Sequence, residues 1–399
     1  MQTVIDRLAV KLVPTALLIA IATFVIMVLS KFDLYTSINR AVTVLVVFCP
    51  CALFLSTPTA VMASIGQASK HGVIIKTFNA LEKLAKVNKI AFDKTGTLTY
   101  GKLNVNDIEN FSDLSDEKIM SLISSLESKS EHPIAKSVTE YLDEKNIKKE
   151  VVENFKMKIA RGVEGDILGN KYFCGNEKYF KENNINIKEN VKEKIEKYSS
   201  EAKNIILFGD EKEVLSIVTL SDTLRENAKE MVENLKNFEI EPLLLTGDNL
   251  STAKYFSEKV GITNVKAELS PEEKFENIKS LKENNVVCMI GDGINDAPAL
   301  KLSDVSVAMG KTGSDISIES ANIVLMGHDV SKIVYLKKLA NATVKTIKFN
   351  IVASLLINFV AVILSVLGVL NPLVGAIVHN LGSILVILNA SLLYDRKFN

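Results

Sequence analysis

The sequence has no excess of charge of either sign. Its 399 residues include 47 Lys and Arg against 47 Asp and Glu, so the formal net charge at pH 7 is +0 with histidine neutral. This balance gives no reason to expect a polyanionic partner such as nucleic acid. Cysteine is scarce, with four residues in the chain. Two of them, Cys174 and Cys288, lie in the polar middle of the sequence, where we expect reduced and unpaired thiols.

The sequence also lacks internal repeats and low-complexity tracts, and no small-residue cleavage site follows its first apolar segment, so that segment is not a signal peptide. What it does contain is two pairs of apolar segments that flank a long Lys- and Glu-rich stretch. These segments cover residues 12–30, 41–64, 352–367 and 372–394. A bilayer span needs roughly 20 residues, so four membrane spans are expected. Buried helices of a large soluble core are the weaker alternative.

Short connections join the two segments of each pair, at residues 31–40 and 368–371. The long middle region and both chain ends are therefore expected on one side of the membrane. Lysine and arginine are dense on that side, as is typical of cytoplasm. They include Arg7, Lys11, Lys70, Lys76, Lys345, Lys348, Arg396 and Lys397. The pattern predicts a multi-pass protein of the cell membrane whose catalytic domains are cytoplasmic.

Three apolar strand-like runs in the middle region each end in a polar loop that carries an aspartate. The runs are residues 89–92, 242–245 and 286–290, and the loops that follow contain Asp93, Asp248, and Asp292 with Asp296. Ligands of open α/β sheets bind at the carboxyl ends of strands. The three loops therefore predict one site. Ordinary surface turns are the alternative, because Asp and Gly are common turn residues.

The residue types suit phosphoryl transfer. A carboxylate can attack phosphorus directly, and the rest of the catalysis is alignment and neutralisation of charge. Mg2+ prefers carboxylate and carbonyl oxygens, which fits Asp93, Asp292 and a backbone carbonyl near Thr95. Lys274, after a Ser-Pro-Glu-Glu run, could supply a positive charge.

Residues 93–97, Asp-Lys-Thr-Gly-Thr, resemble the phosphorylation loop of P-type ATPases, and residues 291–298, Gly-Asp-Gly-Ile-Asn-Asp-Ala-Pro, resemble their magnesium-binding hinge motif. The resemblance implies that Asp93 forms an aspartyl phosphate and that Asp292, with Asp296 close by, holds Mg2+. It also implies catalytic roles for several residues around them. These are Lys94, Thr95, Thr246, Gly247, Asp248 and Lys274, with Asp222 and Arg225 supporting the domain.

A membrane-anchored phosphatase of the haloacid dehalogenase type is the rival from another class, since P-type ATPases share that fold. Such phosphatases usually carry a second Asp two residues after the nucleophile as a general acid. This chain has Thr95 at that place. Loss of the proton donor favours a lasting phosphoenzyme, which a pump needs and a phosphatase avoids.

The nucleotide-binding domain is expected in an insertion at residues 104–215, with helices near residues 115–128 and 134–144. Residues 130–133, Ser-Glu-His-Pro, resemble the His-Pro signature of the heavy-metal branch, whose histidine approaches adenine; alone, His-Pro is more often a helix start. The resemblance implies ATP contacts at Glu127, His132, Pro133, Gly162, Gly165, Gly175 and Asn176. One departure is Ala160, where the branch has the first glycine of Gly-x-Gly. We expect its methyl group to weaken nucleotide binding slightly.

Residues 49–51, Cys-Pro-Cys, lie within the second apolar segment. Proline breaks the helical hydrogen bonding there, and local unwinding can turn the sulfurs of Cys49 and Cys51 toward one ion. Thiolates select soft or borderline metals such as Cu(I), Zn(II) or Cd(II). Two small apolar residues in a membrane helix are the plainer alternative. With the phosphorylation loop downstream, the motif is similar to that of heavy-metal-transporting P-type ATPases.

Two further side chains are candidate ligands of the transported ion. His379 lies in the last apolar segment, where copper pumps tend to carry Met and zinc or cadmium pumps Asp. Asn358 lies where copper pumps have Asn and zinc pumps Lys. A helix-packing role is the alternative for His379. Cysteine with histidine favours a borderline divalent ion such as zinc or cadmium over Cu(I), which stays an open alternative.

The opening residues resemble the stretch before the third core helix of family members, and no Thr-Gly-Glu actuator loop occurs. The resemblance therefore covers about the carboxyl-terminal half of the family architecture. The chain is then a fragment, one part of a split pump, or a remnant that binds ATP or metal without turnover. A separate actuator-domain half or a metallochaperone is a candidate partner, beside the lipid bilayer and the heavy-metal cation.

The expected fold is an α-helical membrane portion, an α/β haloacid-dehalogenase-like phosphorylation domain and an inserted α+β nucleotide-binding domain. The predicted limits are 1–85 for two membrane helices and a stalk, 86–103 with 216–332 for the phosphorylation domain, 104–215 for the nucleotide domain and 333–399 for two further membrane helices. The predicted function is ATP-driven export of a heavy-metal cation, with ATP and Mg2+ as cofactors.

Overall fold

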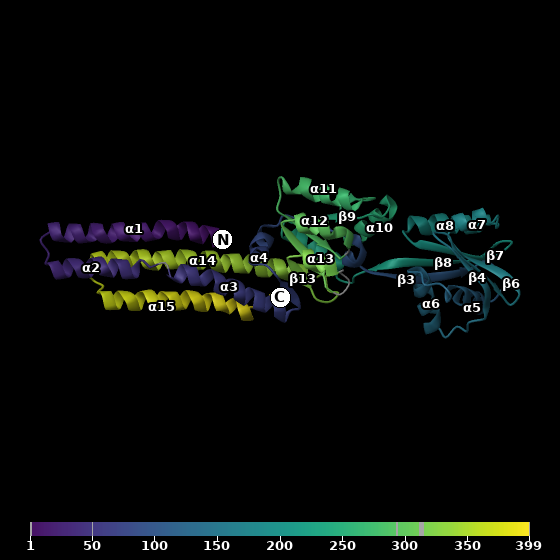
Figure 1. Cartoon of the computed structure of the whole chain (residues 1–399), viewed down its shortest axis with the longest axis horizontal. Coiled ribbons are helices and arrows are strands. Elements are labelled where there is room, and N and C mark those ends of the chain that lie inside the picture. The colour runs from purple at the N-terminus through teal and green to yellow at the C-terminus, as the bar shows by residue number, and fades with distance from the viewer. Residues whose placement is uncertain (1, 50, 293, 311–314, 399) are drawn as a thin grey trace.

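The molecule is elongated, with helices at one end, a sheet-and-helix body in the middle and a second, smaller body at the far end (Figure 1). The computed structural model describes residues 2–49, 51–292, 294–310 and 315–398. Both chain termini lie where the helical end meets the middle body (Figure 1).

Long apolar helices make up the helical end. They are α1 (Gln2–Leu29), α2 (Leu34–Val47), α3 (Cys51–Lys70), α14 (Lys332–Val366) and α15 (Pro372–Ser391). Asp33 caps the start of α2 by accepting a hydrogen bond from the Thr36 amide, and Asn371 caps α15 in the same way through the Val374 amide. The segment predicted at residues 41–64 is divided between α2, which ends at Val47, and α3, which begins at Cys51.

Two helical stretches among the described residues are long and apolar enough to cross a membrane, Lys332–Val366 and Pro372–Asp395. Shorter apolar helical stretches cover Val13–Leu29 and Leu34–Val47. Of the four predicted spans, the last two therefore lie in helices that have the length and composition of membrane spans. The first predicted segment lies almost wholly within α1, and the second is divided between α2 and α3.

The middle body is built on a seven-stranded sheet in the order β1-β13-β12-β11-β2-β9-β10. Its strands are β1 (Val73–Ile75), β2 (Lys89–Phe92), β9 (Glu241–Leu245), β10 (Asn264–Lys266), β11 (Val287–Gly291), β12 (Val305–Met309) and β13 (Ile323–Leu325). The neighbouring pairs are parallel, except that β1 runs antiparallel to β13.

Helices cover both faces of this sheet, as the alternation of its buried residues requires. Ile90 and Phe92 of β2 join a core with α4 (Phe78–Lys86), α9 (Ala228–Asn237), α10 (Leu250–Val260) and the first turns of α14. Ala91 faces the other way, into a core with α11 (Pro271–Lys282) and α12 (Ala297–Leu302). The short helix α13 (Asp315–Ser320) precedes β13. This doubly wound architecture confirms the predicted α/β domain.

The far body is a six-stranded antiparallel sheet in the order β3-β8-β7-β6-β5-β4. Its strands are β3 (Thr99–Asn110), β4 (Val152–Lys158), β5 (Gly162–Ile167), β6 (Asn170–Gly175), β7 (Asn204–Asp210) and β8 (Val214–Leu224). Two helix pairs pack with it, one in each of two separate cores: α5 (Asp116–Glu127) with α6 (Pro133–Glu144), and α7 (Glu177–Glu182) with α8 (Glu189–Ser200).

The paired strands β3 and β8 connect the two bodies (Figure 1). Thr99 at the start of β3 pairs with Leu224 at the end of β8, next to the middle body. The predicted domain limits at residues 103/104 and 215/216 thus fall inside this strand pair. The division of the chain at those residues stays a prediction.

Candidate functional site

The carboxyl ends of three neighbouring strands meet at one edge of the seven-stranded sheet. β2 lies between β11 and β9, and the three run parallel. Asp93 follows β2, Asp292 follows β11, and Thr246, Gly247 and Asp248 follow β9. The structure therefore brings together the three loops that the sequence singled out, at the edge where open α/β sheets bind ligands.

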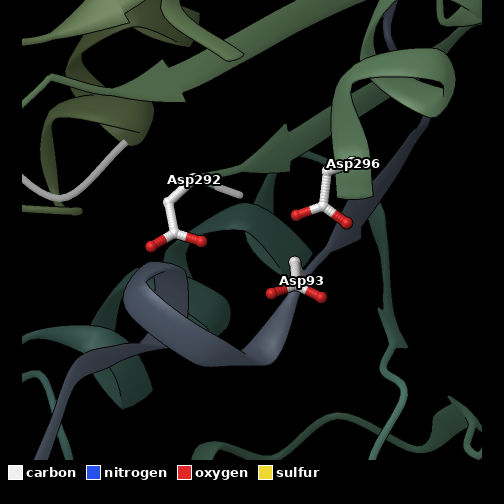
Figure 2. A group of neighbouring side chains, drawn as sticks. All are labelled: Asp93, Asp292 and Asp296. Carbon is white, nitrogen blue, oxygen red and sulfur yellow. The ribbon is translucent and has the colours of Figure 1, made fainter. Parts of the chain in front are cut away.

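Three carboxylates converge at this edge (Figure 2). Asp93, Asp292 and Asp296 each offer an oxygen within 4.8 Å of the others. Lys274, near the start of α11, binds two of them, because its Nζ contacts Asp93 Oδ1 and lies 2.8 Å from Asp296 Oδ1. Asp93, Asp296 and Lys274 are all buried, while Asp292 is half-buried.

Crowding of negative charge sets the protonation of this cluster. Burial, followed by the charge of Asp296, raises the pKa of Asp93 to about 7 against the opposing effect of Lys274. Burial and the charges of Asp93 and Asp296 raise the pKa of Asp292 to about 7 as well. Burial works against the charge of Lys274, but the two neighbouring carboxylates outweigh it and raise its pKa. A divalent cation would relieve this repulsion, so the carboxylates present fit Mg2+.

Glycine is required where the loop after Asp93 passes the carboxylates. Gly96 has a φ of +68°, and a Cβ atom there would lie 1.5 Å from Asp292 Oδ2. At Gly291, a Cβ atom would lie 2.8 Å from Asp296 Oδ2. The backbone can approach the acidic cluster this closely only without side chains.

Lys94 and the loop after β9 form the outer wall of the site. The Nζ of Lys94 lies 2.5 Å from Asp248 Oδ2, and Thr246 Oγ1 accepts a hydrogen bond from the Asp248 amide at 3.1 Å. Lys94, Thr95 and Asp248 line a cavity of about 450 Å³ that also includes Lys203 of the far body. Gly247 leaves room beside the Leu269 carbonyl, which a Cβ atom would meet at 3.3 Å.

Arg225 and Asp222 hold the loop from the side of β8. Arg225 donates hydrogen bonds to the carbonyls of Gly96, of Thr97 at 2.8 Å and of His328 at 2.7 Å. Asp222 accepts from the hydroxyl of Thr99 and from the amide of Gly101 at 3.1 Å. Sequence reasoning assigned these two residues to support, and the structure places their contacts on the loop that follows Asp93.

A second cavity, of about 590 Å³, opens in the far body. Five of the residues expected to contact ATP line it: Glu127, His132, Gly162, Gly175 and Asn176. The two others, Pro133 and Gly165, are not among its described lining residues. Pro133 begins α6, and Gly165 packs closely enough that a Cβ atom would lie 2.8 Å from Val152 Cγ1. The structure therefore places these two residues outside the described lining of the cavity.

His132 serves as the cap of α6, since its Nδ1 accepts a hydrogen bond from the Ile134 amide at 3.3 Å. The helix-start interpretation of His-Pro is thus correct, and the same histidine lines the cavity. Glu127 lies deeper, and burial raises its pKa although the Cys174 thiol donates a hydrogen bond to it. Burial, with the charge of Glu127, holds the pKa of Cys174 well above its usual value.

Ala160 lies at the turn between β4 and β5 with a φ of +57°, in the left-handed region. Its carbonyl accepts hydrogen bonds from Asn176 Nδ2 at 3.0 Å and from Arg161 at 3.1 Å. Glycine adopts this conformation without strain, whereas alanine does not. The departure noted in the sequence therefore carries a conformational cost in addition to an added methyl group.

Three of the candidate metal ligands lie on helices of the membrane portion, Cys51 on α3, Asn358 on α14 and His379 on α15, and Cys49 lies between α2 and α3. Asn358 of α14 donates a hydrogen bond to the Cys49 carbonyl at 3.3 Å, which joins two of them. Cys51 begins α3, but its side chain lies outside the described residues, as does Pro50. The Nδ1 of His379 is buried and has no hydrogen-bond partner in the described part of the chain.

His379 lies on the face of α15 that meets α2 and α14. Gly375 and Gly382 share that face, since they are four residues before and three residues after His379. A Cβ atom at Gly375 would lie 2.9 Å from Val47 of α2, and one at Gly382 would lie 3.4 Å from Ile357 of α14. Val47 is two residues from Cys49 and Ile357 is next to Asn358. His379 is therefore at the level of the other candidate ligands.

Sequence reasoning missed a neutral hydrogen-bond network around Asn350 of α14. Asn350 lies eight residues before Asn358, which at 1.5 Å per residue is about 12 Å closer to the middle body along the helix. Asn350 donates to Ser56 Oγ at 2.8 Å and to the Val386 carbonyl at 3.1 Å, and accepts from Asn389 at 2.6 Å. These contacts join α3, α14 and α15. A buried asparagine in an apolar helix was the available signal, because such residues need partners in the membrane.

Comparison with known proteins agrees with this geometry. Residues 87–304 match the family model described as haloacid dehalogenase-like hydrolase. A probable cadmium-transporting ATPase of Alkalihalophilus pseudofirmus is 36% identical over 97% of this chain and 54% of its own length. A copper-exporting P-type ATPase B of Archaeoglobus fulgidus is 35% identical over 98% of this chain and 57% of its own length. A solved structure of a zinc-transporting ATPase superposes with a TM-score of 0.88 at 28% identity, over 98% of this chain and 63% of that one.

The chain belongs to the heavy-metal-transporting P-type ATPases. It spans roughly half the length of these curated relatives. The similarity covers the membrane helices as well as the catalytic domains, because nearly the whole chain is matched. The chain is almost equally identical in sequence to a relative named for cadmium and to one named for copper, so these comparisons do not identify the transported metal.

Proposed function

We propose that this chain forms the catalytic and membrane core of an ATP-driven heavy-metal pump, in which Asp93 accepts the γ-phosphoryl group of ATP. The observation that carries the proposal is the buried cluster of Asp93, Asp292, Asp296 and Lys274 at the carboxyl edge of the sheet. Asp93 lies 181 residues before Lys274, so the fold brings distant parts of the chain together here. Such an arrangement serves a charged ligand better than it serves stability.

In the proposed reaction an oxygen of Asp93 attacks the γ-phosphorus, the bond to the bridging oxygen breaks, and ADP leaves. The cation of Lys274 offsets negative charge on Asp93 and on the transferred group. Asp292 and Asp296 would hold Mg2+, which neutralises phosphate charge when bound. Arg225 keeps the Gly96 and Thr97 carbonyls in place, so that the loop after Asp93 has a fixed course.

Thr95 supports a lasting phosphoenzyme. It occupies the place of the general acid in phosphatases of this fold, and a threonine hydroxyl does not act as an acid near neutral pH. Water therefore lacks a proton-transfer partner at this position, and the acyl phosphate persists. The alternative of an anchored phosphatase predicts instead rapid hydrolysis of small phosphate esters at Asp93.

The 590 Å³ cavity of the far body is proposed to receive the adenosine part of ATP. Its size suits a nucleotide, and Gly162 and Gly175 let the backbone approach the ligand. His132 and Glu127 supply ring and carboxyl contacts at its wall.

The cargo is proposed to be a zinc- or cadmium-like cation, held by Cys49, Cys51, His379 and Asn358 and released outward. Imidazole together with thiolate suits a borderline divalent ion. The Nδ1 of His379 has no hydrogen-bond partner among the described residues and lies on the helix face that meets α2 and α14, which favours this assignment over one for Cu(I) alone. Export across the cell membrane with cytoplasmic catalytic domains, and cooperation with an actuator-bearing half or a metallochaperone, belong to the same proposal.

The test is acid-stable labelling of the purified chain from γ-32P-ATP in the presence of Zn(II), Cd(II), Co(II) or Cu(I). We expect label that rises with Zn(II) or Cd(II) and that loses this dependence in Cys49→Ser/Cys51→Ser. Stimulation by Cu(I) alone would assign a copper pump. Label that no metal alters would contradict transport, and fast ester hydrolysis without label would assign the phosphatase. A folded chain that binds ATP and metal but takes no label would be the inactive remnant.

A further inference from the structure

Lys337 is a buried lysine that neither phosphoryl transfer nor the metal path uses. It lies in the second turn of α14, near the end of that helix that meets the middle body, and is 5% exposed. No carboxylate lies within salt-bridge distance of it in the described part of the chain. A charged side chain buried without an acidic partner is costly, so its surroundings must compensate.

The compensation comes from the end of α4. Lys337 Nζ donates hydrogen bonds to three carbonyl oxygens there, those of Leu84 at 3.0 Å, Ala85 at 2.9 Å and Val87 at 3.0 Å. The last carbonyls of a helix have no partners within the helix and carry its negative dipole end. An ammonium group with three donors satisfies them in one place. The contact therefore fixes α14 to the C-terminus of α4.

α4 stands directly before the strand that carries the phosphorylated aspartate. Val87 precedes Asp93 by six residues, and β2 lies between them. The side chains of Leu84 and Ile90 share one core with Leu336 of α14. A displacement of the start of α14 would thus reach β2 through both the hydrogen bonds of Lys337 and this packing.

The other end of the same helix reaches the metal motif. Asn358 lies 21 residues beyond Lys337, about 32 Å along α14 at 1.5 Å per residue. Asn358 contacts the Cys49 carbonyl. The second route from that motif is α3, which leads through β1 into α4. Both routes from the metal motif therefore converge on α4.

We propose that Lys337 is a positioning residue that couples metal occupancy at Cys49 to the placement of Asp93, by binding the end of α4 to α14. The proposal rests on the function proposed above and adds a named link between its two sites. With Lys337 in place, a shift of α14 moves α4 and β2 together. Without it, the metal site and Asp93 each keep their local structure but respond independently.

The experiment follows hydrogen exchange in residues 78–98 of the full chain in lipid nanodiscs, with and without Cd2+. In the wild type we expect Cd2+ to change exchange in this segment by about fivefold or more. Lys337→Met should remove the response while Cd2+ and ATP affinities stay within about threefold of the wild type. Lys337→Arg, which keeps the charge and the donors, should restore part of it. Lys345→Met, an exposed lysine on the same helix, should behave as the wild type.

A second measurement records the stimulation of Asp93 labelling by Cd2+ in the same variants. Lys337→Met should bring the ratio of label with and without Cd2+ to about one. A wild-type segment that ignores Cd2+, or a Lys337→Met variant that keeps the response, would overturn the coupling. Loss of Cd2+ binding, ATP binding and thermal stability together in both Lys337 variants would show a merely structural role and overturn it too. If Cd2+ changed hydrogen exchange in residues 78–98 as expected but Asp93 took no label, the result would refute the proposed phosphorylation and support the coupling through Lys337.

Discussion

The acidic site of the middle body and the candidate metal site of the helical end accommodate charge in opposite ways. At the sheet edge, three carboxylates lie within 4.8 Å and one buried lysine offsets them in part. At the membrane level, the neighbours are amides, hydroxyls and one imidazole, with Asn350 and Asn358 making neutral hydrogen bonds. The first site concentrates negative charge that a hard cation would relieve, whereas the neighbours at the second site are neutral groups, which avoid the cost of placing charge at membrane depth.

The difference also decides how firmly each site is built. At the acidic site, the backbone that follows Asp93 is held by hydrogen bonds from Arg225 and to Asp222. At the membrane site α2 ends at Val47 and α3 begins at Cys51, and the Nδ1 of His379 has no hydrogen-bond partner among the described residues. We therefore expect substitutions at the catalytic end to abolish function, and those at the membrane end to change the choice of ion.

The largest effect is expected from Gly96→Ala. The new methyl group would overlap Asp292 Oδ2, so either the loop or the carboxylate must move. A displacement of about 1 Å costs about 100-fold in rate, and we expect at least that loss of phosphoenzyme. Gly169→Ala is the matched control, because Gly169 also has a positive φ but nothing lies within 4 Å of its Cβ position. It should cost about 1 kcal/mol of stability and leave labelling unchanged. Equal loss of label in both variants would show that backbone strain alone is responsible.

The next effect sharpens the contrast at the membrane end. His379→Ala should weaken Zn(II) or Cd(II) binding by about 10- to 100-fold, since an imidazole ligand is lost, and leave Cu(I) binding nearly unchanged. Asn380→Ala, an exposed neighbour on α15, serves as the control. Metal affinities measured by competition with chelators decide the matter. Unchanged Zn(II) and Cd(II) affinity in His379→Ala would reduce His379 to a packing residue.

A third prediction concerns pH at the catalytic end. Mg2+ bound at this cluster would compete with protons on Asp93 and Asp292, whose pKa values are raised to about 7. Mg2+ affinity should therefore fall about tenfold or more between pH 8 and pH 6, measured by calorimetry. The sign for stability is also fixed. Because both pKa values exceed the unfolded values, the contribution of these groups to stability is present below about pH 4 and is lost as pH rises through about 7.

The Mg2+-free chain should accordingly lose stability on the order of 1 kcal/mol for each of these carboxyl groups between pH 5 and pH 8, and Mg2+ should restore it. Asp93→Asn removes one of the charges and should flatten this dependence. A Mg2+-free chain that melts at a higher temperature at pH 8 than at pH 5 would contradict the crowding of charge in Figure 2.

The smallest effect is expected from Ala160→Gly in the nucleotide cavity. Glycine removes the cost of the left-handed conformation, about 1 kcal/mol, and clears a methyl group from the cavity wall. We expect a gain in stability of that order and ATP binding tighter by about two- to fivefold. Leu168→Gly, at another left-handed position outside the cavity lining, should give the stability gain alone. Weaker ATP binding by Ala160→Gly would show that the methyl group contributes a favourable contact.

Sequence patterns predicted the acidic site well because its members end strands of a parallel sheet, and parallel strands place their ends at one edge. Asp93, Asp292 and the turn at Asp248 followed from that rule, and the doubly wound fold confirmed their proximity. Lys274 could be suggested only as a positive charge. Its double contact depends on how α11 packs, which no local pattern reveals.

Other features were beyond the reach of the sequence. Gly165 shares a motif with Gly162, yet it packs against Val152 and is not among the residues that line the cavity. Successive residues along a strand point to opposite sides of the sheet, and the motif alone does not tell which side faces the cavity. The contacts of Lys337 and of Asn350 join segments about 250 and about 300 residues apart in sequence, as tertiary structure alone can do.

The most direct test of the central claim is to locate the acid-stable phosphate on the chain after reaction with γ-32P-ATP and Mg2+. The account predicts that the label is sensitive to hydroxylamine, maps to the peptide containing Asp93, and is absent from Asp93→Asn although that variant binds ATP as the wild type does. Label that persists in Asp93→Asn, or that maps to another peptide, would contradict it.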